Sequence, residues 1–424
     1  MGWVMVLLPV VLLILGFPVF LILLSTSAVV LLFFVDIPAT AVHQVMFGSL
    51  DKFALLAVPF FIFAGELMSR GGVSRRIVRW VTSIIGSVQG SLPLTALGTA
   101  TVFGAISGST AATVAAVGSL TYDPLRKAGY SEKFSTGLLT SAGAISNIIP
   151  PSIAMILYGA AAQQSVVELF AAGISPGLVI AFLFGCYIYV HARRAGIREV
   201  EKFRWSEFLA ATRDGIWAII APIIILGGIY TGIFSPTEAA GVASVYAIFT
   251  TVLVYRDITL REMFDVAARS MYLTAQIFII VAVAGVYSWL LTVSGAANAA
   301  TDFIGGLEME PWMILLIINI FLLLIGTVLD TASAILVLTP LLVPIATAAG
   351  VDLVHFGIIV VVNLSIGTFT PPFGLNIFVG QAIFKAPLSS IYPGLIPFIT
   401  LSIIGLLIIT YVPDLSLWVL KYIG

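Results

Sequence analysis

Long apolar runs separated by short polar segments make up most of this 424-residue chain. A helix needs about 20 predominantly apolar residues to cross the hydrocarbon core of a bilayer. The pattern therefore predicts an all-α polytopic membrane protein. The predicted spans cover about 3–15, 18–35, 53–69, 132–163, 168–191, 216–233, 237–255, 271–293, 353–382 and 390–412.

Two further apolar runs, at 90–127 and 311–350, are too long for one crossing. Each has a centre of small and polar residues, Ser107-Gly108-Ser109-Thr110 in the first run and Gly326 to Ser333 in the second. We interpret each run as a re-entrant hairpin, in which two half-helices meet at a polar tip inside the membrane.

A double proline interrupts two of the predicted spans, Pro150-Pro151 in 132–163 and Pro371-Pro372 in 353–382. Adjacent prolines remove backbone donors and cannot lie inside a continuous helix. In hydrocarbon, the backbone groups that a break frees must find a partner other than water. Broken helices at corresponding positions of two halves are typical of the binding site of a secondary transporter.

The placement of charge orients the chain. Only 9% of its residues are charged, compared with about 25% in soluble domains. If each hairpin returns to the side it left, all of the 19 basic residues except Lys52 and Lys421 fall on one side. The positive-inside rule makes that side the cytoplasm, so both termini are predicted to face outward.

The same topology predicts two inverted repeats of five transmembrane helices plus one re-entrant hairpin each. An offset of 221 residues pairs the two tips, at Thr110 and Thr331, and the two breaks, at Pro150 and Pro371. The expected parts are an N-terminal repeat (1–190), a charged cytoplasmic linker (191–214), a C-terminal repeat (215–412) and a tail (413–424). A shorter segment precedes each hairpin, at 73–88 and 296–306, and the first is expected to be an amphipathic helix at the membrane surface.

The tips and breaks carry the candidate chemistry. Free carbonyls and amides at half-helix ends carry partial charge, and small residues let the backbone approach a ligand closely. Na⁺ can be held by several such oxygens without a full counter-charge. The alternative is that these segments are packing motifs for close helix approach. We predict two Na⁺ sites and no other metal, the first formed by Ser107, Gly108, Ser109, Thr110, Ser146, Asn147 and Pro150, the second by Gly326, Asp330, Thr331, Ser333, Thr368, Thr370 and Pro371.

A substrate held between the two tips would contact Ser109, Asn147, Thr331 and Asn376. Asn376 has an alternative role in an interhelical hydrogen bond. Asp330 either balances a cation or carries a proton, or it only caps the half-helix that begins at about Thr331. No Lys or Arg is expected near a tip or a break, so an anionic substrate would be neutralised by helix ends and bound Na⁺.

Other polar residues have structural interpretations. The sequence from Ser235 to Glu238 is typical of a capping box with proline at the first helical position. Glu66 is expected to pair with Arg70 one turn later. No P-loop, dinucleotide fingerprint or nucleophile elbow occurs in the sequence. We therefore expect neither an enzyme, nor an organic cofactor, nor a nucleic-acid partner.

At these motifs the chain resembles the large membrane subunit, the M or DctM-type permease, of tripartite ATP-independent periplasmic (TRAP) transporters. The resemblance runs nearly end to end. It is carried by 59–68, 104–110, 149–152, 235–240 and 370–374.

The resemblance implies an elevator-type, ion-transporter-like fold in the bacterial inner membrane, driven by an inward Na⁺ gradient. It implies a small Q-type membrane subunit on a separate chain and a periplasmic substrate-binding protein as partners. Substrates of the family are organic anions such as C4-dicarboxylates, sialic acid and sulfonates.

Two other transport functions remain open at this point. A stand-alone Na⁺/anion symporter of related architecture would need no binding protein. In an ion channel the hairpins would serve as pore loops. A channel should also have a continuous polar path lined by its helices, and the predicted spans are too apolar to form one.

Overall fold

This computed structural model describes residues 1–35, 38–197, 203–295, 299, 306 and 309–422. Helices form the regular secondary structure of these residues. No strand occurs in these residues. Seven of the described helices are long and apolar enough to cross a membrane, and one bent pair, Glu132–Ile148 with Ile153–Ala162, makes an eighth. The prediction of an all-α polytopic membrane protein is confirmed.

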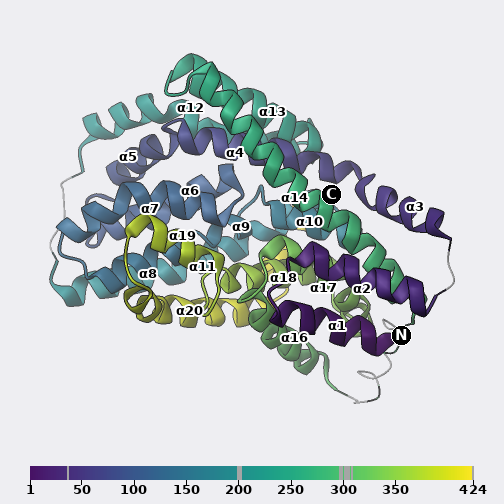
Figure 1. Ribbon diagram of the computed structural model, residues 1–424. Coiled ribbons are helices and arrows are strands. Elements are labelled where there is room, and N and C mark those ends of the chain that lie inside the picture. The colour runs from purple at the N-terminus through teal and green to yellow at the C-terminus, as the bar shows by residue number, and fades with distance from the viewer. Residues whose placement is uncertain (36–37, 198–202, 296–298, 300–305, 307–308, 423–424) are drawn as a thin grey trace.

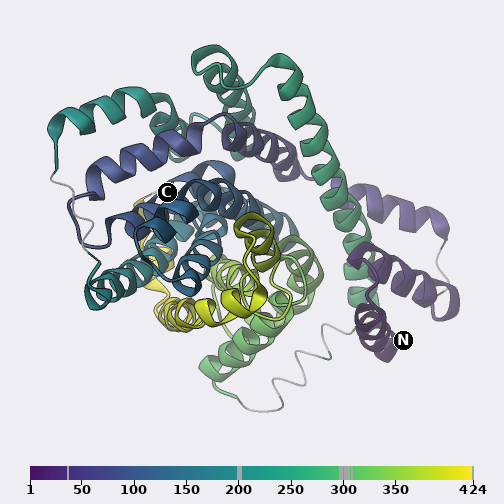
Figure 2. The same cartoon turned by 60° about the vertical axis from the view of Figure 1, so that its left-hand side comes forward.

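The helices form an outer group and an inner bundle (Figure 1). Figure 2 shows the outer group curving around one side of the inner bundle. The outer group consists of α1 (Gly2–Ile14), α2 (Val19–Phe33), α3 (Ala39–Leu50), η1 (Phe53–Leu56), α4 (Ala57–Arg70), α5 (Val73–Ile85), α12 (Trp205–Tyr230), α13 (Pro236–Ile248), η2 (Phe249–Val254) and α14 (Leu260–Val293).

The inner bundle contains both hairpins and both broken helices. Its elements are α6 (Ser91–Ser107), α7 (Thr110–Lys127), α8 (Glu132–Ala142), α9 (Ile145–Ile148), α10 (Ile153–Ala162), α11 (Val166–Ala195), α16 (Pro311–Gly326), α17 (Thr331–Ala348), α18 (Leu353–Gly367), α19 (Leu375–Phe384), α20 (Leu388–Tyr411), α21 (Asp414–Leu417) and η3 (Trp418–Tyr422). Each group therefore draws helices from both halves of the chain.

The two halves repeat the same order of elements at the predicted offset of 221. The second arm of each hairpin begins at the paired threonine, Thr110 in α7 and Thr331 in α17. The helix before each break begins after a paired cap, Ser131 for α8 and Asp352 for α18. Both prolyl–prolyl bonds at the breaks are cis. The fold is that of two repeats, each with one hairpin and one broken helix.

The pairing also explains two elements that differ from the sequence prediction. At this offset α3, η1 and α4 together correspond to the single 34-residue helix α14. The helix α14 begins at Leu260, whereas the predicted span begins at 271. A 34-residue helix is about 51 Å long, which is well beyond the thickness of the hydrocarbon core. Hydropathy detects only its apolar part, because Arg261, Glu262 and Asp265 lie in the first turns. It missed α3 because apolar positions alternate there with Thr40, His43, Gln44 and Ser49.

The predicted linker 191–214 is largely helical, because α11 continues to Ala195 and α12 starts at Trp205. The segment 296–306 lies almost entirely outside the described residues. The predicted amphipathic helix is present as α5, but its arginine face meets the acidic residues Asp214 and Asp257 as well as the surface.

Candidate functional site

The first hairpin tip packs directly against the first break. Gly108 has a φ of 56°, which favours glycine and ends α6, and the Ser109 hydroxyl then accepts a hydrogen bond from the Ala112 amide to cap α7. A Cβ on Gly104 would lie 2.7 Å from the Cα of Ser146. Only a glycine allows this separation, so the small residues of the tip serve close approach to the broken helix.

The second tip repeats this arrangement with different residues. A Cβ on Gly367 would lie 2.4 Å from the carbonyl carbon of Gly326, so α16 and α18 touch through their backbones. Asp330 caps α17, since its carboxylate accepts hydrogen bonds from the Ser333 amide at 3.1 Å and the Ser333 hydroxyl at 2.5 Å. The predicted cap is therefore present. Asp330 also lines a cavity.

The breaks place short helices on either side of the tips. The axis of α8–α9 and that of α10 differ by 42°, and Ser152 caps α10 by accepting from the Met155 amide. Across the second break, the backbone N–H of Asn376 donates to the Thr368 carbonyl at 2.8 Å. The backbone groups released by the prolines are thus partly satisfied within the protein, as a low-dielectric environment demands.

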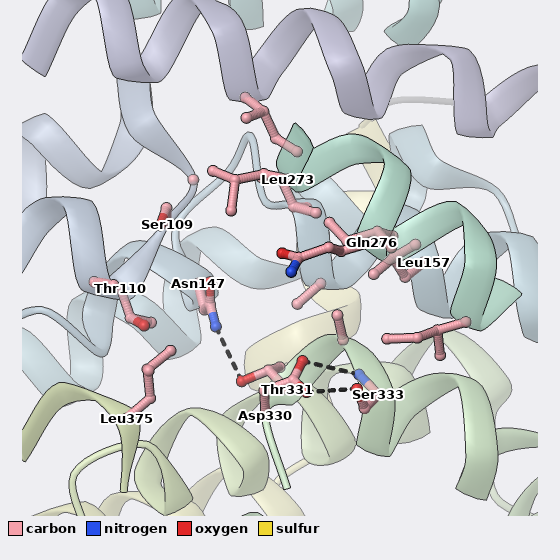
Figure 3. Close-up of a pocket in the computed structure, with 18 of the residues that line it drawn as sticks. Ser109, Thr110, Asn147, Leu157, Leu273, Gln276, Asp330, Thr331, Ser333 and Leu375 are labelled. Atoms are coloured by element: carbon pink, nitrogen blue, oxygen red, sulfur yellow. Dashed lines mark hydrogen bonds between the residues drawn. The ribbon is translucent and has the colours of Figure 1, made fainter. Parts of the chain in front are cut away.

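A cavity of about 750 Å³ lies between the outer group and the inner bundle. The outer group contributes Pro18, Glu66 and Gln276, among others, and the inner bundle contributes both tips (Figure 3). The predicted site residues that line it are Ser107, Gly108, Ser109, Thr110, Asn147, Asp330, Thr331, Ser333 and Thr368. The structure therefore brings the two tips and one residue of each break into one space.

The remaining predicted residues, Ser146, Pro150, Gly326, Thr370, Pro371 and Asn376, do not line this cavity. The Ser146 hydroxyl donates to the Gly143 carbonyl at 2.7 Å, in the link between α8 and α9. The Asn376 side chain is fully buried and donates to the Thr140 carbonyl of α8 at 3.3 Å. Of the two roles considered for Asn376, the structure has the interhelical hydrogen bond.

One hydrogen bond in the cavity joins the two repeats. The Asn147 amide nitrogen, at the first break, lies 3.4 Å from the Thr331 hydroxyl oxygen, at the second tip (Figure 3). Asn147 is 6% exposed, and Ser333, which follows Thr331 by two residues in α17, is 1% exposed. Both predicted sites therefore face the same cavity.

Sequence reasoning missed two polar residues that line the cavity, Glu66 of α4 and Gln276 of α14. The expected pair between Glu66 and Arg70 is wrong, since it is not among the ion pairs of the described residues and Glu66 turns to the cavity instead. Gly65 explains this position: its Cβ would lie 2.9 Å from the Cα of Ser107, so α4 lies against the first tip. A carboxylate within an apolar span was the available signal.

Most of the cavity lining is apolar, and its polar side chains supply oxygen atoms but no positive charge. Glu66 and Asp330 are the ionisable residues among the described residues that line it, and no Lys, Arg or His is among them. Hydroxyl, amide and carboxylate oxygens are the ligands that hard cations such as Na⁺ prefer. No group of three His, Cys, Asp or Glu side chains suited to a transition metal occurs within the described ranges. The donor set fits an alkali cation.

Comparison with known proteins identifies a family that matches nearly the whole chain. The family model for the DctM component of the tripartite ATP-independent periplasmic transporter matches residues 5–415. The chain is 39% identical over 379 residues to the C4-dicarboxylate TRAP transporter large permease protein DctM of Pseudomonas aeruginosa, covering 89% of each chain. It is 37% identical over 411 residues to the ectoine/5-hydroxyectoine TRAP transporter large permease protein UehC of Ruegeria pomeroyi, covering 96% of each.

A third relative and one solved structure extend the comparison. The isethionate TRAP transporter permease protein DctMQ of Oleidesulfovibrio alaskensis is 38% identical over 384 residues, which are 90% of this chain and 60% of that protein. The YdaH transporter of Alcanivorax borkumensis has a similar fold, with a TM-score of 0.55 and 13% identity, over 98% of this chain and 100% of that one. The chain belongs to the DctM family, the large permease component of tripartite ATP-independent periplasmic transporters.

Proposed function

We propose that this chain is the transport subunit of a Na⁺-coupled importer that carries a small organic anion across the bacterial inner membrane. The observation that carries the proposal is the cavity between the outer group and the inner bundle, which both hairpin tips and one residue of each break line. The predicted site residues of the two repeats, which lie far apart in the sequence, line the same cavity. If these segments were only packing motifs, they would have no reason to meet in one space.

Two cations would bind at the two tips. At the first, the hydroxyls of Ser107, Ser109 and Thr110 and the amide oxygen of Asn147 supply neutral ligands. At the second, Thr331, Ser333 and Thr368 supply hydroxyls, and Asp330 adds a carboxylate. Because the cavity has two carboxylates and no basic side chain among its described residues, cations must enter before or with an organic anion. Binding of Na⁺ and of substrate should therefore be cooperative, with the same factor in both directions.

An elevator movement would take place between the outer group and the inner bundle. Each group has its own helix packing, and the cavity lies on the boundary between them. If the inner bundle slides along the outer group, both tips and any ligand between them move together and the cavity is exposed to the other side. The alternation is then a rigid-body displacement of one group against the other, as in other transporters built from inverted repeats.

The substrate class and the partners follow from the family. Relatives are described as permeases for C4-dicarboxylates, for isethionate and for ectoine, so the substrate is a small organic acid or a compound of similar size. A periplasmic binding protein would deliver it, and a small Q-type subunit would complete the membrane complex. In one relative, DctMQ, the name indicates that both membrane components lie in one protein.

The test is uptake by the purified complex of this chain and its small subunit in liposomes, with the loaded binding protein outside. Uptake should rise steeply with external Na⁺ and should stop when choline replaces Na⁺. Uptake that ignores this replacement but follows a proton gradient would overturn Na⁺ coupling and favour Asp330 as a proton carrier. Uptake of free substrate by this chain alone would instead favour a stand-alone symporter.

A further inference from the structure

A second cavity, which we call the vestibule, lies at another point of the boundary between the outer group and the inner bundle. It has a volume of about 220 Å³, and its lining includes Ser49, Lys52, Ala160, Gln163, Ser288 and Trp289. Lys52 is the basic residue among the described residues that line either this cavity or the central one. Lys52 is half-buried, and an ammonium group partly removed from water requires polar partners that replace the lost hydration.

The vestibule and the central cavity follow one another along the same three helices. In α10 the lining passes from Leu157 in the central cavity to Ala160 in the vestibule, about one turn further. In α17 it passes from Ser333 to Leu336 in the same way, and in α14 the two linings are adjacent, at Ile280 and Val281. At most one turn of apolar side chains thus separates the two spaces. A path between the groups would connect them.

Lys52 is held at this position by the inner bundle. Its ammonium group donates to the Ala160 carbonyl at 2.5 Å, in the last turn of α10, where the partial charge of the helix is negative. An ammonium group has three donors, so two remain for a ligand. Gln163, which is exposed, and Ser288 line the same space and offer a side-chain amide and a hydroxyl to the same ligand.

Lys52 also breaks the repeat symmetry. At the offset of 221 its counterpart is Leu273, inside the continuous helix α14, whereas Lys52 lies in the interruption between α3 and η1. The positive-inside rule puts Lys52 on the outer side, where Lys421 is the other basic residue. The interruption of the helix therefore places a positive charge on the side from which the substrate arrives.

We propose that the vestibule is an outer receiving site for a small organic anion, with the Lys52 ammonium group binding its carboxylate or sulfonate before the anion enters the central cavity. This inference rests on the proposed import of an organic anion. Lys52 supplies the positive charge that the central cavity lacks, and the substrate leaves it for the cation-loaded tips. The same contact with Ala160 would break when the inner bundle moves.

The electrostatic test needs neither uptake nor an identified substrate. In a Cys186→Ser background, Ser288→Cys or, as a second reporter, Gln163→Cys is labelled from outside in the reconstituted complex. The reagents are an anionic and a cationic methanethiosulfonate of similar size. Lys52→Met should lower the anionic-to-cationic rate ratio by at least about tenfold, whereas Lys52→Arg and the matched control Lys421→Met should leave it unchanged. An unchanged ratio in Lys52→Met, or labelling from the inside only, would overturn the proposal.

Two further measurements separate a receiving site from a mere latch between the groups. Succinate outside should slow the anionic labelling when Lys52 is present and should have no effect in Lys52→Met. In uptake with the loaded binding protein, Lys52→Met should raise KM about tenfold with little change in kcat. Equal protection by succinate in both proteins, or a change in kcat alone, would contradict the receiving site while leaving the proposed import intact.

Discussion

The amide nitrogen of Asn147 lies 3.4 Å from the hydroxyl oxygen of Thr331, although 184 residues separate them in the chain. Asn147 belongs to the break of the first repeat and Thr331 to the tip of the second (Figure 3). The two repeats thus share one cavity, and residues of both predicted cation sites line it. A ligand that binds between these side chains contacts both halves of the inner bundle at once.

Loss of a hydroxyl at the second tip or the second break should weaken Na⁺ binding. Thr331→Val and Thr368→Val preserve shape but remove one oxygen ligand each from the cavity. We expect the half-saturating Na⁺ concentration for uptake to rise about tenfold in each, corresponding to about 1.4 kcal/mol. Thr400→Val is the matched control, because Thr400 is exposed and its hydroxyl bonds within α20. Equal Na⁺ dependence in all three variants would mean that these threonines only pack.

A methyl group at the second backbone contact should disable transport. In Gly367→Ala the new Cβ would lie 2.4 Å from backbone atoms of Gly326, which a side-chain movement cannot relieve. Overpacking of this kind costs about 1–3 kcal/mol, and it would also displace Thr368. We expect uptake to fall more than about tenfold, with a smaller loss in Gly326→Ala, where the nearest contact is 3.2 Å.

Gly227→Ala in α12 is the control for these variants, because a Cβ there would meet nothing within 4 Å. It should retain normal uptake, since alanine is favourable in a helix. Normal uptake in Gly367→Ala as well would show that α16 and α18 can separate without affecting the site.

The arginine face of α5 should contribute to the stability of the outer group. Arg76 donates to the Asp257 carboxylate at 2.5 Å, lies 3.6 Å from the centre of the Tyr255 ring, and its side chain is only 13% exposed. Arg76→Ala leaves Asp257 without this partner, which for a largely buried pair is strongly destabilising. We expect the thermal melting midpoint of the purified complex to fall by several degrees.

Arg75→Ala is the matched control, since Arg75 is 67% exposed and reaches Asp257 only at 3.7 Å. Exposed pairs of this kind contribute little, so the midpoint should not change measurably. A similar decrease in both variants would show that helix surface charge, and not the buried contact, determines the stability.

The orientation of the chain can be read from the two ends of α12. In the Cys186→Ser background, Ser206→Cys lies at the start of this helix and Thr231→Cys directly after its end, and both positions are exposed. The positive-inside rule predicts that an impermeant thiol reagent labels Thr231→Cys from outside and reaches Ser206→Cys only after permeabilisation. The opposite labelling pattern would invert the topology and would place Lys52 on the cytoplasmic side.

The sequence predicted much of the fold because lipid leaves few alternatives. Hydrocarbon requires nearly every backbone group to bond within the protein, so apolar length alone identified most helices. Proline and glycine have local effects that do not depend on packing, and they marked both breaks and both tips. The offset of 221 could be recognised for the same reason, because the paired caps Ser131 and Asp352 are local signals.

The tertiary structure alone decided which polar residues share one space. None of Ser146, Thr370 and Asn376 lines the central cavity. The hydroxyls of Ser146 and Thr370 donate to carbonyls three and four residues back, and the Asn376 side chain bonds to Thr140. Glu66 and Gln276 do line it, because Gly65 lets α4 rest on the first tip and α14 runs past the second. The direction in which a helical side chain points depends on the helices around it, and that packing between distant segments is not encoded in any local pattern.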